Sequence, residues 1–285
     1  MFIAAGQEGI IVQSADGNSW EPANEPTESL VYRLAAFGND TFAVLGSRGR
    51  TSSFAASSTG KDWEVETKDL GYKDIARGLA FGNGQFLAFI GNPGSPRPEP
   101  HVSLSKKGSD WSKPVPISGK QMLQQAVYGN GIWAAIGDRG RYSYSTDGLE
   151  WENVPGTRPL DTMIAITFAN GRFVATGLHG SRRYSDDGKR WSEPEEGLEG
   201  EHINSVLWTG SAFVGIGDGA TYASQDGKAW ERVPNKNAPT FATYGNGLFV
   251  GISYKGIIRI SRDAIEWEQV HKAKYNFETI TYGAV

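Results

Sequence analysis

The sequence contains no cysteine among its 285 residues, which excludes disulfide bonds, thiolate catalysis and cysteine-ligated metals. It has no apolar run long enough to cross a membrane, so we expect no membrane insertion. Neither sign of charge dominates: 28 basic and 32 acidic residues give a net charge of −4, which argues against a dedicated nucleic-acid binder. The sequence also lacks a phosphate-binding glycine loop before a helix and a Gly-x-Ser-x-Gly nucleophile turn.

Histidine is scarce, and the four histidines show no metal-ligand spacing: His101, His179, His202 and His271. We expect them on the surface or in loops, and we expect neither a metal nor a cofactor. No charged leader with an apolar stretch and a cleavage site opens the chain. The protein is therefore expected in the cytoplasm if Met1 is the native start, and outside the cell if Met1 replaces a removed signal.

A repeated phrase, Ser-x-Asp-Gly-x-x-Trp, occurs seven times with tryptophans 37 to 48 residues apart. Five copies keep both the aspartate and the tryptophan: Asp16 and Trp20, Asp147 and Trp151, Asp187 and Trp191, Asp226 and Trp230, Asp263 and Trp267. Thr59 and Lys107 replace the aspartate before Trp63 and Trp111, and Ala264 replaces the last glycine. The interval also holds across the join of the C-terminal tail to the N-terminus, which indicates a closed ring of repeats.

Each repeat contains a hairpin signal. In the fourth repeat, residues 163–168 are apolar and β-branched, which favours a buried strand. Asn170-Gly171 suits a type I′ turn, and residues 172–177 alternate with a period of two. Together with the two segments around the Trp phrase, every repeat supplies four short antiparallel strands, here named a to d in chain order.

Repeats of about 40 residues with four strands each predict a β-propeller. The end of the chain, Tyr282-Gly-Ala-Val285, and its start, residues 1–6, read as one hairpin cut at its turn. We therefore predict an all-β fold and a single domain, residues 1–285: a seven-bladed propeller whose seventh blade combines residues 275–285 with residues 1–22. An open solenoid is the alternative, but it needs polar capping repeats that this chain lacks.

The Trp phrase resembles the Asp-box of the sialidase (BNR) repeat family, and the resemblance covers the whole chain. It implies structural turns between strands c and d, on the face away from a catalytic site. Sialidases of this family typically have six blades and an early Arg-Ile-Pro segment, whereas this sequence has seven repeats and no Arg-Ile-Pro. The resemblance thus favours a non-sialidase branch. Seven-bladed relatives that are not enzymes, such as photosystem II assembly factors, dock protein partners.

The residue types of the phrase have a local physical reason. A short carboxylate accepts backbone N–H bonds inside a tight turn, glycine takes a left-handed conformation, and tryptophan covers the turn. A metal or catalytic array of these aspartates is disfavoured, because equivalent copies point in different directions around a ring.

Function is expected at the other end of the ring, where the b–c and d–a loops vary in length and chemistry. The b–c loops carry eight basic residues: Arg48, Arg50, Arg97, Arg139, Arg141, Arg182, Arg183 and Lys255. The d–a connections are acidic, as in residues 193–201. This predicts a basic centre inside an acidic rim, with solvated loop charges as the alternative.

Aligned by their turns, the a strands place one residue each at an equivalent level: Arg33, Arg77, Gln124, Ile164, Asn204, Thr240 and Glu278. Such a ring suits a carboxylate, sulfate or phosphate, since arginine binds these anions with two parallel hydrogen bonds. A hydrated pore is the alternative. The predicted ligand-binding residues are Arg33, Arg77, Arg139 and Arg182, with Gln124 and Asn204 as neutral hydrogen-bonding partners.

These features predict a monomeric, non-catalytic binding module for a protein partner, an anionic small molecule or a glycan. The alternative is a glycan-acting enzyme, a glycoside hydrolase or polysaccharide lyase, that uses Glu278 with Asp74 or Asp161 as its paired carboxylates. A structural spacer in a larger assembly is a third possibility.

Overall fold

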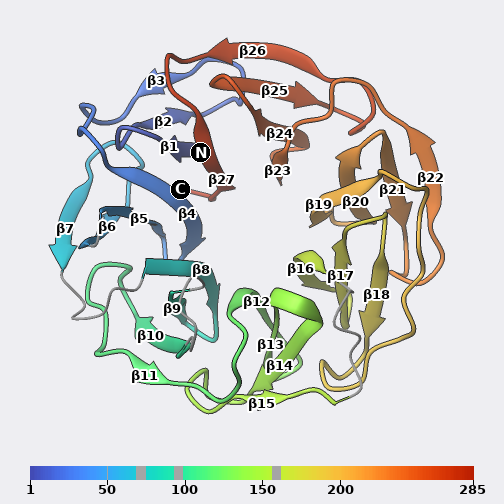
Figure 1. The fold of residues 1–285 in the computed structure, drawn as a ribbon. Coiled ribbons are helices and arrows are strands. Elements are labelled where there is room, and N and C mark those ends of the chain that lie inside the picture. Colours follow the sequence, from blue (N-terminus) through green and yellow to red (C-terminus); the bar gives the residue numbers. More distant parts are fainter. Residues whose placement is uncertain (50, 69–74, 93–98, 156–161) are drawn as a thin grey trace.

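Seven antiparallel sheets surround a central axis in the structure, a computed structural model that describes residues 1–49, 51–68, 75–92, 99–155 and 162–285. Figure 1 shows one strand of each sheet next to the axis and the others stacked outward. The predicted seven-bladed β-propeller is confirmed. Among the described residues, no helix is long and apolar enough to cross a bilayer.

The blades are named by the order of the repeats. The first three comprise β4 (Val31–Gly38), β5 (Thr41–Arg48), β6 (Thr51–Ser57) and β7 (Glu64–Lys68); β8 (Ile75–Gly82), β9 (Gln85–Gly91), β10 (His101–Ser105) and β11 (Val115–Pro116); and β12 (Leu123–Gly129), β13 (Ile132–Gly137), β14 (Arg141–Ser145) and β15 (Glu152–Asn153), with a 3₁₀ turn η1 (Asp138–Gly140). The next three comprise β16 (Met163–Ala169), β17 (Arg172–Gly177) and β18 (Arg182–Ser185); β19 (His202–Trp208), β20 (Phe213–Asp218), β21 (Ala220–Ser224) and β22 (Glu231–Pro234); and β23 (Phe241–Gly245), β24 (Leu248–Ser253), β25 (Ile257–Ser261) and β26 (Glu268–Lys272). The seventh comprises β27 (Phe277–Tyr282), β1 (Phe2–Gly6), β2 (Ile11–Ser14) and β3 (Glu21–Pro22).

The ring closes through the two ends of the chain. β27 pairs with β1 in an antiparallel register that sets Phe2 opposite Tyr282 and Ala4 opposite Ile280. The Met1 amino nitrogen donates to the Gly283 carbonyl at 2.8 Å, and the Gly283 N–H donates back to Met1 at 3.0 Å. Figure 1 shows the two termini close together on the inner side of this blade. Pairing the ends removes two free sheet edges.

The fourth blade differs at its outer position. Residues 192–195 lie along β18 and are joined to it by one bridge, between Arg182 and Glu195, instead of a regular strand. The Ser192 hydroxyl accepts the Tyr184 N–H at 3.1 Å in place of a backbone carbonyl. Pro194 has no N–H to donate, so a longer ladder does not form here.

Close contacts between neighbouring blades explain the repeated aromatic-Gly-Asn sequence. A Cβ atom added to Gly38 would lie 2.1 Å from the Phe81 ring of the next blade. The same ring contact recurs at Gly129 with Phe168, Gly245 with Tyr282, and Gly283 with Phe37, at 2.2–2.3 Å, and at Gly82 the Tyr128 Cβ atom lies 2.2 Å away. The contact of Gly283 with Phe37 joins the seventh blade to the first. The glycines therefore make room for an aromatic ring between blades, in addition to serving the hairpin turn.

In all seven Trp-phrase turns, the serine hydroxyl accepts the backbone N–H of the residue three positions further on. In the first, Asp16 Oδ1 accepts the backbone N–H groups of Asn18 and Ser19 at 2.8 Å, and Ser14 Oγ accepts that of Gly17. The Trp20 indole N–H donates to the Gly17 carbonyl at 2.8 Å, and four other copies form the same bond, whereas the buried indole N–H of Trp191 has no partner among the described residues. The two copies without aspartate rebuild the pattern. Thr59 Oγ1 accepts two backbone N–H groups at 3.1 Å. In the turn that contains Lys107, Asp110 Oδ1 accepts the Lys107 N–H and the Ser105 hydroxyl instead.

The tryptophans of these turns pack between blades. Trp111 lies 5.6 Å from Phe54, Trp151 lies 5.1 Å from Phe89, and Trp191 lies 4.9 Å from Tyr142, measured between ring centroids. In each pair the partner ring belongs to the preceding blade. The indole thus joins two sheets, which goes beyond the predicted role of covering its own turn.

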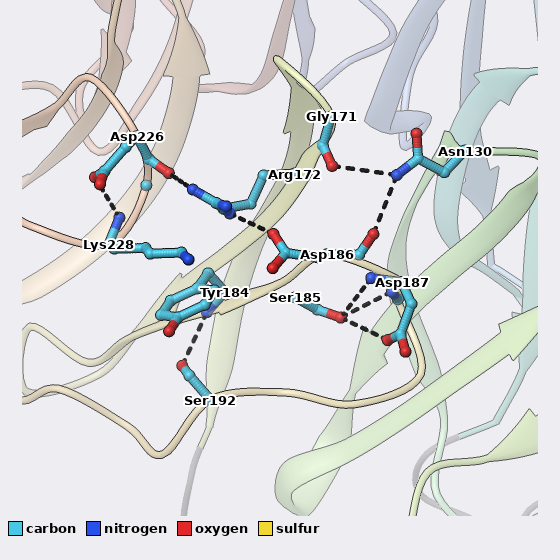
Figure 2. Close-up of polar contacts among 12 residues, drawn as sticks. Asn130, Gly171, Arg172, Tyr184, Ser185, Asp186, Asp187, Ser192, Asp226 and Lys228 are labelled. Atoms are coloured by element: carbon cyan, nitrogen blue, oxygen red, sulfur yellow. Dashed lines mark hydrogen bonds and ion pairs between the residues drawn. The ribbon is translucent and has the colours of Figure 1, made fainter.

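Polar side chains add further links between blades at the turn end of the ring, as Figure 2 shows. The Asn130 amide donates to the carbonyls of Gly171 and Asp186 in the next blade, both at 3.1 Å. Arg172 forms an ion pair with Asp186 at 2.7 Å and also donates to the carbonyl of Asp226 one blade further on. This end of the molecule is thus built from contacts that hold neighbouring blades together.

The hydrogen bonds to the turn aspartates are expected to stabilise the protein less in acid. Burial raises the pKa of Asp187, but bonds from the backbone of Arg190 and Lys189 and from the side chains of Arg190 and Ser185 outweigh it and hold the pKa at about 2. An unfolded aspartate has a pKa of about 3.9, so this contribution is complete above about pH 4 and is lost as the pH falls through about 2. We expect Asp187→Asn to cost about 1 kcal/mol at pH 7 and progressively less below pH 4.

Thermal unfolding of both proteins between pH 7 and pH 3 measures this effect. Asparagine keeps an oxygen that can accept the two backbone N–H groups, so Asp187→Asn removes chiefly the charge. Thr59→Val is the control, because it perturbs the equivalent turn, whose two backbone N–H groups bind a hydroxyl that does not titrate. Its Tm deficit is expected to be the same at every pH. A deficit for Asp187→Asn that does not shrink in acid contradicts the prediction.

Candidate functional site

β-bulges near the start of the inner strands build a ring of side chains around the axis. The pairing of β4 with β5 shifts register between Tyr32 and Leu34, which leaves Arg33 without a cross-strand partner. Equivalent shifts leave out one residue each in five other inner strands: Arg77, Gln124, Ile164, Asn204 and Glu278. A bulge re-aims the extra side chain. We call these six residues the mouth ring.

Glycines permit the close backbone approach at these bulges. A Cβ atom on Gly46, opposite the bulge of β4, would lie 2.2 Å from the Val31 carbonyl oxygen. Glycines occupy the same place in four other blades, at 1.8–2.1 Å from a carbonyl oxygen: Gly6, Gly137, Gly177 and Gly217. The sixth blade has Ser253 there, and its inner hairpin pairs without a register shift. Bulge and glycine therefore occur together in these blades.

The mouth ring opens into a central cavity of about 400 Å³. All six of its residues line the cavity, as the alignment of the a strands predicted. The sixth blade departs from that alignment: Phe241 lines the cavity and Thr240 does not. Phe241 is the equivalent of Leu34 and Thr279, which also line the cavity in blades that have the bulge. Phe241 is 37% exposed and was not anticipated from the sequence.

The mouth ring is electrostatically uneven. Arg33 is exposed, and its nearest polar contact is the Ser47 hydroxyl at 3.3 Å. Arg77, from the neighbouring blade, has a buried Nε without a partner among the described residues. On the other side of Arg33, Glu278 accepts a hydrogen bond from Gln7 at 3.2 Å. Two guanidinium groups with few hydrogen-bond partners thus lie on neighbouring inner strands, next to the strand that carries one carboxylate.

Gln124 contacts the b–c loop of the third blade, the loop that carries Arg139. Gln124 Nε2 donates to Asp138 Oδ1, and Asp138 is the first residue of η1. Arg139 follows it in a left-handed conformation with φ of 55° and is exposed. Arg139 is not among the residues that line the cavity, so it lies above the mouth ring on the loop.

Arg182 lies outside the cavity and is occupied by other contacts. Its side chain is 5% exposed, pairs with Glu195 at 3.0 Å and lies 4.5 Å from the centre of the Tyr222 ring. Arg182 Nη1 also donates to the Gly180 carbonyl at 2.5 Å. These contacts join the fourth blade to the fifth. The structure thus separates Arg182 from Arg33 and Arg77, with which the sequence grouped it.

The expected basic centre is smaller than the loop sequences suggested. Arg141 is buried and donates to the carbonyls of Ser118 and Gln121, and burial lowers its pKa to about 10. Arg183 is also buried, with its guanidinium over the Tyr142 ring. Arg50 and Arg97 lie outside the described residues. Arg48, Arg139 and Lys255 are the exposed basic residues in the described parts of these loops. Three of the eight cations are therefore structural.

The described part of the cavity contains one carboxylate, Glu278. Asp74 and Asp161, its expected partners in a hydrolase, lie outside the described residues. Glu201 is 6% exposed and binds Arg232 and Tyr222. The bond from Arg232 lowers its pKa, burial opposes this, and the pKa is about 2. Glu201 is thus a carboxylate held in place by Arg232 and Tyr222. Among the described residues of the cavity, no second carboxylate accompanies Glu278.

The histidines occupy more varied places than expected. His101 is buried in β10, contrary to the predicted surface position. His179 and His202 come together from a b–c loop and an inner strand, with ring centroids 5.6 Å apart. His202 Nδ1 accepts the backbone N–H of His179 at 3.2 Å. In the described ranges, no cluster of three or more metal-ligating side chains is found.

Comparison with known proteins supports the fold. No protein-family model matches the chain, and no curated protein matches it either. Among solved structures, YCF48 bound to D1 peptide is similar with a TM-score of 0.60 and 17% identity, over 90% of this chain and 84% of that one. YCF48 from Cyanidioschyzon merolae gives 0.63 and 12%, over 90% and 91%. The WD40 β-propeller domain of Doa1 gives 0.60 and 11%, over 86% and 84%. By its architecture, this chain is therefore a β-propeller similar in shape to YCF48 and to the WD40 propeller of Doa1.

Proposed function

We propose that this propeller is a protein-binding module whose mouth ring receives an acidic segment of its partner. The observation that carries the proposal is the series of six β-bulges, each of which turns one side chain to the same level of a central cavity. Bulges interrupt a hydrogen-bond ladder and are over-represented next to functional sites. Five of the six side chains are polar, as expected for a surface that binds polar groups.

The chemistry of the ring selects an anion. Arg33 and Arg77 come from adjacent inner strands, and a guanidinium binds a carboxylate with two parallel hydrogen bonds. Gln124 and Asn204 add neutral donors and acceptors. Similarity of shape to YCF48 bound to D1 peptide supports a peptide as the ligand class. Docking of an acidic peptide therefore accounts for the ring without invoking catalysis.

The experiment uses a fluorescently labelled capped peptide, acetyl-Gly-Asp-Asn-Asp-Gly-amide, as the probe. We expect the double variant Arg33→Ala, Arg77→Ala to weaken its binding roughly 100-fold, because each charge-assisted hydrogen bond contributes about 1.5 kcal/mol. The salt dependence of binding should fall as well. The matched control is Lys106→Ala, Arg262→Ala, which removes two exposed cations from the turn end of the ring. Equal binding by the double variant and the wild type refutes the proposal.

A further inference from the structure

A second ring of side chains lines the cavity two residues beyond each mouth-ring residue and, in the sixth blade, two residues beyond Thr240. All seven members are aliphatic: Ala35, Leu79, Ala126, Ile166, Val206, Ala242 and Ile280. Two residues of strand correspond to about 6.6 Å, so this aliphatic ring lies below the mouth ring. Between the two rings, one residue past the mouth-ring level, Gln125, Ser205 and Thr279 also line the cavity. The cavity therefore has a polar, partly cationic entrance and an aliphatic ring below it, which we call the floor.

The floor leaves apolar surface uncovered in the middle of the protein. Ala35, Leu79, Ala126, Ile166 and Ile280 line the cavity and are only partly buried, although each also packs against the core beside it. The other two members, Val206 and Ala242, are buried. Apolar atoms that face water inside a concave site favour an apolar ligand group, since its binding removes both surfaces from water. An acidic group alone would contact the entrance and leave this floor unused.

The entrance of the cavity has a cationic side and an apolar side. Arg33 and Arg77 lie on the first two blades, whereas Phe241 lies on the sixth with 37% of its surface exposed. A ligand that satisfies both sides carries an anion and an apolar group next to each other. The cavity of about 400 Å³ has room for a side chain or two. It excludes a folded helix, which is about 10 Å across with its side chains.

We propose that the cavity binds an aliphatic side chain of the partner that stands next to an acidic residue, with the aliphatic group on the floor and the carboxylate at Arg33 and Arg77. This inference rests on the proposed function and specifies the sequence that the module recognises. The charge of the two arginines selects the acidic neighbour, and the aliphatic ring selects leucine-like side chains over polar ones of similar size.

Two capped peptides that differ at one position test the inference: acetyl-Gly-Asp-Leu-Asp-Gly-amide and acetyl-Gly-Asp-Asn-Asp-Gly-amide. Burial of a leucine side chain predicts a preference of roughly 10- to 100-fold for the first peptide. Ala126→Leu fills the floor and is expected to abolish this preference. Ala126→Ser keeps the size of the floor and is the matched control. Ala35→Leu fills the cavity from another blade and serves if Ala126→Leu fails to fold.

The outcomes separate this inference from the proposed function. Equal binding of the two peptides by the wild type, or a preference that persists in both filled variants, overturns the apolar floor as a recognition site. If Arg33→Ala, Arg77→Ala still binds acidic peptides more weakly than the wild type in that case, the proposed function is retained and only the apolar specificity is rejected. Octanoate that binds more tightly than the leucine peptide assigns the cavity to a free aliphatic acid and also overturns the inference.

Discussion

Trp151→Ala is expected to lower the free energy of unfolding by about 3–5 kcal/mol, the range found for removal of a large buried aromatic side chain. The Trp151 side chain is 5% exposed, and its indole N–H donates to the Gly148 carbonyl at 2.9 Å. It belongs to a buried cluster with Phe89, Leu87 and Trp133, which come from two different blades. The substitution therefore opens a cavity between the second and third blades, where neither sheet can collapse without moving the ring.

Trp151→Phe separates the two contributions of the indole. Phenylalanine keeps much of the buried apolar area but cannot donate to Gly148, so we expect a loss of about 1–2 kcal/mol. Urea unfolding of the wild type and both variants, followed by tryptophan fluorescence and circular dichroism, gives the free energies. A cost below about 1 kcal/mol for Trp151→Ala contradicts the packing argument. The capped leucine peptide should still bind, because Trp151 does not line the cavity.

Gly46→Ala is expected to cost about 3 kcal/mol and to weaken peptide binding at the same time. The added Cβ atom would lie 2.2 Å from the Val31 carbonyl oxygen and 2.7 Å from the Tyr32 Cα, both backbone atoms that cannot move aside cheaply. Relief requires a change in the bulge between Tyr32 and Leu34, and that bulge holds Arg33 in the mouth ring. We therefore expect a loss in binding at least as large as that caused by Arg33→Ala.

Arg33→Ala is the comparison that isolates the role of the backbone. Arg33 is exposed, so its truncation is expected to change stability by less than about 0.5 kcal/mol while weakening the binding of acidic peptides roughly 10-fold. Urea unfolding and peptide titration of both variants give the two quantities. If Gly46→Ala folds with wild-type stability and binds normally, then the link between the glycine, the bulge and the ring is wrong.

Parts of the site could be predicted because they follow from strand periodicity. The alignment of a strands by their turns brings Arg33, Arg77 and Gln124 to one level, and the structure places them around one cavity. The same alignment, read two residues further along, contains the aliphatic ring. It wrongly included Thr240, because the absence of a bulge in the sixth blade is visible only in the strand register.

The loop charges could not be predicted in this way. Arg182 and Arg139 have the same charge and occupy corresponding loops, but Arg182 is buried beside Tyr222 and Glu195 whereas Arg139 is exposed. The difference arises from two partners of Arg182: Glu195 in its own blade and Tyr222 in the next blade. Those partners are about 13 and 40 residues away in the chain, and no local pattern relates them to Arg182.

The sequence by itself determined the seven repeats, the closure of the ring and the turns around Asp16 and its equivalents. These features depend on contacts within a few residues and on a period that repeats along the chain, so local physical chemistry is sufficient for them. Only the tertiary structure decided which arginines face the cavity, which are buried as links between blades, and that each indole joins two sheets. Such contacts form between blades, where burial and charge partners depend on side chains brought together by the closed ring.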